Sequence, residues 1–329
     1  MRRRSVVKTK VKEAGINRQK NVAQRFTNIL KKNWQLYLMA VPAVALLFCF
    51  AYLPMAGLVI AFKRFDFKLG IWGSPWMNPW YKNFEVIFKN NNAALLAIRN
   101  TIFLNLLFIV CGTTFALALS LSFNEISNKW IKKLTQSFSF LPYFISTVVV
   151  GIFVSGLLSY ENGVINRIIT SMGGEKVAFY MEAKWWPMIM VLVNIWKGAG
   201  YSAVVYLATI SGFDSSYYEA AKIDGATRWQ QVKYISLPLL KPTVIMMTLL
   251  SVGKIMNADF GLFYNVTGDM PTLYATTDVL DTYIYRALRQ LGDIGISSAT
   301  GFFQSVVGFV LVLCSNWVAR KYEEDAALF

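Results

Sequence analysis

Six apolar segments, each long enough to cross a lipid bilayer, constrain the fold of this 329-residue chain more than any other feature. An α-helix rising 1.5 Å per residue needs about 20 residues to cross roughly 30 Å of hydrocarbon. Because a backbone in lipid must satisfy its own hydrogen bonds, we expect an all-α polytopic membrane protein. The six transmembrane helices are expected at residues 35–62, 100–123, 134–159, 185–209, 237–258 and 297–318.

Prolines and composition refine this expectation. Pro42 and Pro54 predict that the first segment is kinked or begins deeper than its apolar limits suggest, and Pro142 predicts the same for the third. The chain has no histidine and no G-x-x-x-x-G-K-[ST] phosphate loop, so neither His-dependent catalysis nor nucleotide binding is expected of it. Its three cysteines lie in apolar segments and indicate neither disulfides nor metal ligands. We expect no metal and no cofactor in this chain.

Basic residues predict the orientation. If the N-terminus is inside, the inner segments carry 19 Lys and Arg residues and the longer outer segments carry 11. The positive-inside rule then places both termini in the cytoplasm. The domains are a basic tail or surface helix at 1–34, a membrane domain at 35–318 and a short tail at 319–329. Since these bases lie next to membrane spans, the net charge of +15 indicates contact with membrane lipid and not with nucleic acid.

The polar loop between the fourth and fifth segments has an ordered design. Ser216 and Glu219 have the spacing of a capping box, which predicts the start of a helix. Gly225 is expected to end that helix in a left-handed conformation. Residues 226–235 are expected to form a second short helix, which Pro238 stops or follows by opening the next. Two short helices joined at a glycine make a rigid projection that can transmit force to a partner protein.

The same loop, at about 212–238, carries a recognisable pattern: Glu-Ala-Ala, three residues, Gly, nine residues, then Ile-x-Leu-Pro. It resembles the EAA loop of permease subunits of binding-protein-dependent ABC importers. Segments 52–55, 70–76 and 278–283 are also similar to LplB-type permeases of the carbohydrate importer family, and the resemblance runs from Trp34 to the C-terminus. It implies the fold of a type I ABC importer permease. The ATPase-coupling residues that it implies are Glu219, Ala220, Ala221, Asp224, Gly225, Leu237 and Pro238.

The resemblance also implies partners. The chain would form half of a heterodimeric, alternating-access pore for an oligosaccharide in the bacterial cytoplasmic membrane, and uronate-containing oligosaccharides are one candidate cargo. A second homologous permease, two ABC ATPases that bind ATP and Mg, and an extracytoplasmic solute-binding protein would complete the importer. The alternatives are a permease for other sugars or amino acids, and an ion-coupled secondary transporter. The last is disfavoured because the six segments contain no Asp or Glu to bind a coupling ion.

Polar and aromatic side chains inside the fourth and fifth segments are candidates for the substrate pathway. Charged groups in hydrocarbon are costly, so they should face protein or a water-filled cavity. The opposing interpretation is snorkelling or hydrogen bonding between helices, and the small residues at 198–200 suit close helix approach or a local break. The candidates are Asn194, Trp196, Lys197, Tyr201, Lys254 and Asn257.

The last outer loop has a helical period of apolar residues from Val279 to Leu291. It predicts an amphipathic helix at the outer mouth, with Arg286 and Arg289 on its wetter side. The first outer loop is rich in Trp, which suits an interfacial belt or a docking surface for a solute receptor.

Overall fold

The computed structural model describes residues 32–90 and 92–322, which are helical apart from connecting loops and one isolated bridge between Lys63 and Trp76. The basic tail and the last seven residues, and the predictions made for them, lie outside the described residues. The expectation of an all-α membrane protein is confirmed. Within the described residues, five helical stretches are long and apolar enough to cross a membrane: Trp34–Phe62, Ala93–Glu125, Ala183–Ser211, Arg228–Gly253 and Ile294–Val318.

The first span up to Val59 belongs to one compact unit, and the chain from Ile60 onward forms a second unit. Helix α2 (Trp34–Leu47) continues through a π-helical turn into α3 (Leu53–Met55) and then a 3-10 segment ending at Phe62. Pro54 lacks the N–H that would bond four residues back. The chain accommodates it with the wider π turn that precedes it, not with a break.

The third predicted span is a sharply bent pair of helices. Helix α7 (Lys129–Phe140) passes through a 3-10 turn into α8 (Thr147–Leu158). The direction of the helix changes by 98° between the two parts. Pro142 lies at the start of the 3-10 turn, where its missing N–H costs nothing. Ser146 then accepts a hydrogen bond from the N–H of Val149 and caps α8. The kink predicted at Pro142 is confirmed, and the pair counts as a sixth span only if both halves are taken together.

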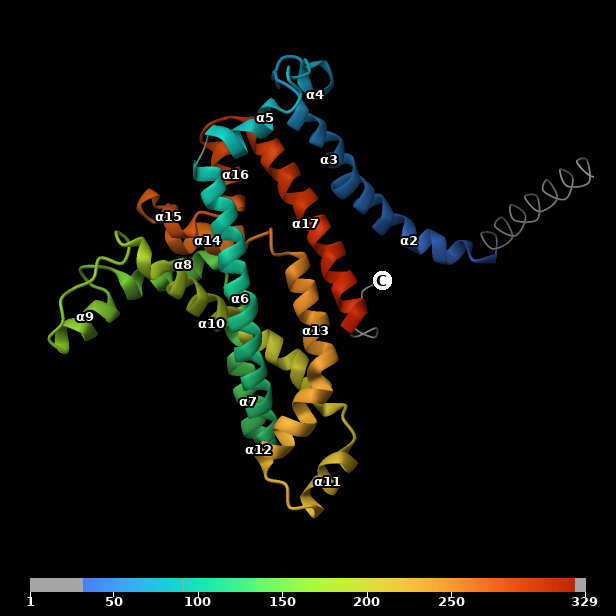
Figure 1. Cartoon of the computed structure of the whole chain (residues 1–329), viewed down its shortest axis with the longest axis vertical. Helices are drawn as coiled ribbons and strands as arrows, with labels where there is room; N and C mark the ends of the chain where they lie inside the picture. The colour runs from blue at the N-terminus through green and yellow to red at the C-terminus, as the bar shows by residue number, and fades with distance from the viewer. Residues whose placement is uncertain (1–31, 91, 323–329) are drawn as a thin grey trace, which may run out of the picture. The chain divides into compact units, whose positions relative to one another are not determined.

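In the second unit, α6 (Asn92–Glu125) packs along α10 (Trp186–Ser211), and α13 (Leu237–Gly253) packs against α17 (Ile294–Tyr322) (Figure 1). Helices α11 (Ser215–Ile223) and α12 (Arg228–Gln231) lie at one end of this unit. The other connecting segments hold α4 (Gly70–Gly73), α5 (Lys82–Glu85), α9 (Val164–Ser171), α14 (Phe260–Thr267), α15 (Tyr274–Thr277) and α16 (Leu280–Arg289).

Two glycines permit unusually close helix contacts. A Cβ on Gly200 of α10 would lie 1.9 Å from the carbonyl oxygen of Ser139 in α7. A Cβ on Gly151 of α8 would lie 2.4 Å from the carbonyl oxygen of Asn265 in α14. The close approach expected at 198–200 therefore occurs at Gly200, where α7 packs against α10.

The amphipathic helix of the last outer loop exists as α16, with Leu280, Tyr283 and Ala287 buried. Arg289 is exposed, as expected, but the prediction for Arg286 was wrong: its side chain is only 12% exposed. The helical period could not show that Asp269 and Asp278, from the preceding loops, form ion pairs with Arg286. Burying a charge is tolerated when partners compensate it.

Candidate functional site

The loop between α10 and α13 begins with a helix capped differently from the prediction. The Asp214 carboxylate accepts a hydrogen bond from the Ser216 N–H at 2.9 Å, so α11 starts at Ser215. The capping box predicted for Ser216 and Glu219 was wrong, because an acceptor two residues earlier already satisfies the free N–H group. The same hydrogen bond holds the pKa of Asp214 below its usual value.

Gly225 adopts the predicted left-handed conformation, with φ of +77°, and ends α11. The N–H of Ala226 donates to the carbonyl of Ala221 at 2.8 Å, a bond that closes the last helical turn. A Cβ at Gly225 would meet nothing within 4 Å, so the backbone conformation alone restricts this position to glycine.

The second short helix is not an independent element. Thr227 and Gln230 form a reciprocal capping box at its start. From Arg228 the helix runs through a π turn at Val232–Ser236 directly into α13, so it is the first turn of the fifth span. Pro238 lies in the first turn of α13 and opens it, in keeping with the second of the two predicted roles.

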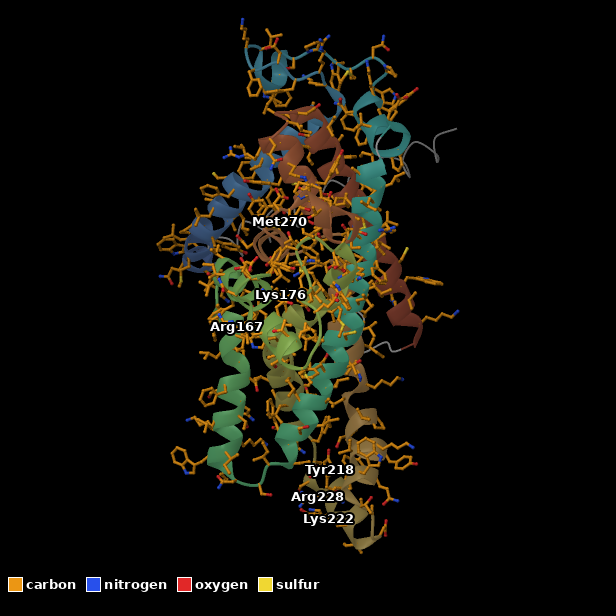
Figure 2. All side chains as sticks on the ribbon, turned by 90° about the vertical axis from the view of Figure 1, so that its left-hand side faces the viewer. Arg167, Lys176, Tyr218, Lys222, Arg228 and Met270 are labelled. Carbon is orange, nitrogen blue, oxygen red and sulfur yellow. The ribbon has the colours of Figure 1, made fainter. Side chains whose placement is uncertain are left out.

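The loop is tied to the membrane helices at two points. The Arg228 guanidinium bonds to the Glu125 carboxylate at the end of α6 at 2.9 Å, and the hydroxyls of Tyr218 and Ser236 lie 2.9 Å apart. Figure 2 shows Tyr218, Lys222 and Arg228 grouped at this end of the molecule. Arg228 thus joins α12 to the end of α6, and Tyr218 joins α11 to the turn that precedes α13.

The coupling residues implied by the resemblance lie on the surface of this loop. Glu219, Ala220, Asp224, Gly225, Leu237 and Pro238 are exposed, and Ala221 is half-buried. Two large side chains beside them are almost uncovered: Ile223 is 87% exposed and Trp229 is 72% exposed. Large apolar side chains exposed around a turn, as Ile223 and Trp229 are here, are typical of a surface that binds a partner protein.

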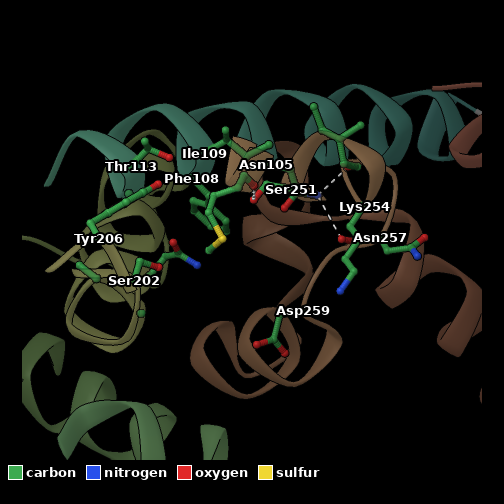
Figure 3. A pocket seen from close by; sticks show the side chains of 16 residues that line it. Asn105, Phe108, Ile109, Thr113, Ser202, Tyr206, Ser251, Lys254, Asn257 and Asp259 are labelled. Carbon is green, nitrogen blue, oxygen red and sulfur yellow. Dashed lines mark hydrogen bonds between the residues drawn. The ribbon is translucent and has the colours of Figure 1, made fainter. Parts of the chain in front are cut away.

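A cleft of about 340 Å³ lies among α6, α10, α13 and the segment that follows α13 (Figure 3). Its apolar wall includes Phe108, Ile109 and Met247. Its polar lining consists of Asn105, Thr113, Asn194, Ser202, Tyr206, Ser251, Lys254, Asn257 and Asp259. Amides, hydroxyls and one pair of opposite charges thus face a single space.

A break in the helical path supplies part of this lining. Helix α13 ends at Gly253 and α14 begins at Phe260, so the predicted span 237–258 was too long at this end. Lys254 caps α13, and Asp259 caps α14 by accepting from the N–H of Leu262 at 3.0 Å. Irregular backbone at such a position is stable where it lines a cavity and its polar groups are satisfied.

Three side chains from other helices hold the broken segment. Asn105 donates to the carbonyl of Ile255 at 2.8 Å, and Gln304 donates to the carbonyl of Met256 at 2.7 Å. The Asp281 carboxylate accepts from the N–H of Ala258 at 2.8 Å, and burial raises the pKa of this carboxyl. Sequence reasoning missed all three residues, because no local pattern links them to a segment up to 152 residues away.

The structure separates the candidate pathway residues into two groups. Asn194, Lys254 and Asn257 line the cleft, whereas Trp196, Lys197 and Tyr201 do not. The Lys197 ammonium donates to the carbonyls of Tyr143 and Ile145, at 3.2 and 2.8 Å, where the bend frees them. The Tyr201 ring stacks on that of Tyr143, with centroids 4.7 Å apart. Lys197 and Tyr201 therefore contact the bend between α7 and α8.

Comparison with known proteins assigns this architecture. The profile of the family described as "Binding-protein-dependent transport system inner membrane component" matches residues 108–324. The chain belongs to this family. The resemblance stated from the sequence is thereby confirmed, and the loop at Glu219 lies within the matched region.

The permease is similar to individual relatives over most of its length. It is 33% identical to Protein LplB of Bacillus subtilis (strain 168) over 296 residues, which cover 90% of the permease and 92% of LplB. It is 35% identical over 290 residues to the polygalacturonan/rhamnogalacturonan transport system permease protein YteP of the same organism, covering 88% and 89% of the two chains.

A chain in the crystal structure of a bacterial ABC transporter involved in the import of the acidic polysaccharide alginate matches with a TM-score of 0.83. The two chains are 35% identical, and the match covers 91% of the permease and 99% of that chain. The importer permease fold expected from the sequence is confirmed by this match.

Proposed function

We propose that this permease forms half of the pore of an ATP-driven importer for acidic oligosaccharides. The observation that carries the proposal is the cleft at the break between α13 and α14, where Lys254 stands among amides and hydroxyls. Amides and hydroxyls from several helices suit the hydroxyls of a sugar. The ammonium of Lys254 suits a carboxylate, since charge-assisted hydrogen bonds are roughly twice as strong as neutral ones.

The relatives support the acidic class of cargo. YteP is described as a polygalacturonan/rhamnogalacturonan permease, and the matched crystal structure as an importer of the acidic polysaccharide alginate. Lys254 forms no ion pair with any described residue, so it is available to a carboxylate, although Asp259 lies in the same cleft. The negative charge of Asp259 near Lys254 would weaken the binding of a carboxylate. This suits a transporter, because it must release its cargo.

The proposal includes a second homologous permease, two ABC ATPases that bind ATP and Mg, and an extracytoplasmic solute-binding protein. The related alginate transporter was crystallised in complex with a periplasmic protein carrying alginate pentasaccharide. Docking of the loaded binding protein and closure of the ATPases would move the loop at Glu219, and the loop's ties to α6 and α13 would pass that motion to the cleft. Both termini would lie in the cytoplasm.

The test compares Lys254→Met with Lys197→Met in proteoliposomes that contain the complete importer and its binding protein. Losing one charge-assisted hydrogen bond, worth about 1.5–3 kcal/mol, should lower uptake of an acidic oligosaccharide by Lys254→Met roughly tenfold or more. Uptake of the same oligosaccharide with its carboxyl groups reduced to alcohols should not change. Lys197→Met should affect both cargoes equally, because Lys197 contacts the bend and not the cleft. An equal change in the uptake of both cargoes, relative to the wild type, in Lys254→Met would refute the assignment of the cleft.

A further inference from the structure

A second groove, of about 350 Å³, lies between the first half of α7 and the last turns of α10. Lys129, Lys132 and Lys133 line it from α7, and Val204, Leu207 and Ala208 line it from α10. At 3.6 residues per turn, these α10 residues lie about half a turn around the helix from residues 198, 202 and 206, which line the cleft. The groove therefore opens on the side of α10 that faces away from the cleft.

Helix α7 has two distinct faces. The three lysines follow the i, i+3, i+4 spacing of one face, and they overlook the groove. The opposite face of α7 is apolar and exposed: Trp130 is 82% exposed and Phe138 is 65% exposed. In a helix that belongs to a membrane-spanning pair, such a face suits contact with acyl chains, with the lysines at the level of the headgroups.

The three ammonium groups lack compensation in the described part of the chain. No ion pair between described residues involves them, and Glu125, on the preceding helix, is paired with Arg228. They also occupy the first turns of α7, where the helix dipole disfavours cations, and Lys129 and Lys133 repel each other at i, i+4. Topology alone requires basic residues on this side but not their convergence on one groove. An anion bound in the groove would offset both the unfavourable helix dipole and the repulsion between the lysines.

We propose that this groove binds an anionic phospholipid. The headgroup phosphate lies among Lys129, Lys132 and Lys133, and an acyl chain lies along Val204, Leu207 and Ala208. Basic pockets between helices at the cytoplasmic surface are suited to such headgroups. The assignment to the inner leaflet rests on the orientation in the proposed function, because the groove lies at the end of α10 that leads into the loop at Glu219. The lipid would brace α7 against α10 beside the coupling loop.

The test is native mass spectrometry of the assembled importer, titrated with phosphatidylglycerol or with phosphatidylcholine. Each lysine near a membrane surface contributes a roughly fivefold gain in affinity for anionic lipid, so Lys132→Gln/Lys133→Gln should bind phosphatidylglycerol about 25-fold more weakly. Lys132→Arg/Lys133→Arg should retain binding. The matched control, Arg320→Gln/Lys321→Gln, removes two exposed charges from the end of α17 and should bind as the wild type does.

Three outcomes would overturn the proposal. The first is equal affinity of the wild type for the two lipids, and the second is equal loss of binding in the lysine variant and its control. The third is a disulfide between a cysteine placed at Ala208 and the second permease, which would make the groove a subunit interface. Lipid binding is measured without cargo or transport, so failure of the cargo assignment does not affect it. A reversed topology would move the site to the outer leaflet without abolishing it.

Discussion

Replacing Arg286 with methionine should destabilise the permease more than any surface change, because it leaves a buried aspartate unpaired. The guanidinium bonds to Asp278 at 2.5 Å and to Asp269 at 3.0 Å, and it lies 4.0 Å from the centre of the Tyr274 ring. Asp278 is 2% exposed and Asp269 is 13% exposed. Burial alone would lower the pKa of Arg286, but the hydrogen bond and charge of Asp278 raise it, so this arginine stays charged.

The expected loss is about 3–5 kcal/mol, the usual cost of removing one partner from a buried ion pair. Methionine fills much of the arginine volume, so the loss reports the orphaned charge of Asp278 more than a cavity. At roughly 2–4 °C per kcal/mol, the unfolding temperature of the purified complex should fall by about 6–20 °C. Thermal unfolding followed by reaction of the native cysteines with a fluorogenic thiol reagent measures this shift.

The control is Arg286→Met combined with Asp278→Asn, which removes both charges. An asparagine at 278 still accepts the hydrogen bond that the Thr282 hydroxyl donates at 2.7 Å. The double variant should therefore recover most of the loss, as a thermodynamic cycle between contacting residues predicts. A fall below about 3 °C in Arg286→Met, or no recovery in the double variant, would refute the view that an unpaired charge dominates.

Three further predictions concern the coupling loop, the helix contact and the topology. Gly225→Val should insert and assemble but lose binding-protein-stimulated uptake, because φ of +77° strains a β-branched residue; normal uptake would contradict the coupling role. Gly200→Ala should lower the yield of folded permease, because its Cβ would lie 1.9 Å from a carbonyl oxygen of α7. The control Gly198→Ala should not lower the yield, because a Cβ there meets nothing within 4 Å. Equal yields of the two variants would show that α7 can move aside. In a cysteine-free background, Asn162→Cys should react with an impermeant thiol reagent in intact cells and Ser127→Cys should not; the opposite result would reverse the orientation.

Local sequence patterns were sufficient for most of the features whose physical cause is local. Membrane insertion depends on the summed hydrophobicity of a segment, so the second, fourth and sixth predicted spans appear as α6, α10 and α17. Gly225 was predicted correctly because only its own φ angle is involved. The capping of α11 was missed although it is also local, because two acceptors with suitable spacing compete and the aspartate forms the cap.

The sequence by itself determined the class of protein, most of its membrane spans and the family to which the chain belongs. Only the tertiary structure decided what surrounds the charged side chains. Lys197 and Lys254 look alike in sequence, yet one donates to carbonyls freed by the bend at Pro142 and the other caps α13 beside the cleft. The helical period placed Arg286 on the solvent side, but in the structure it is buried and paired with two aspartates. The cost of burying a charge depends on partners distant in the chain, and hydrophobic periodicity carries no information about them.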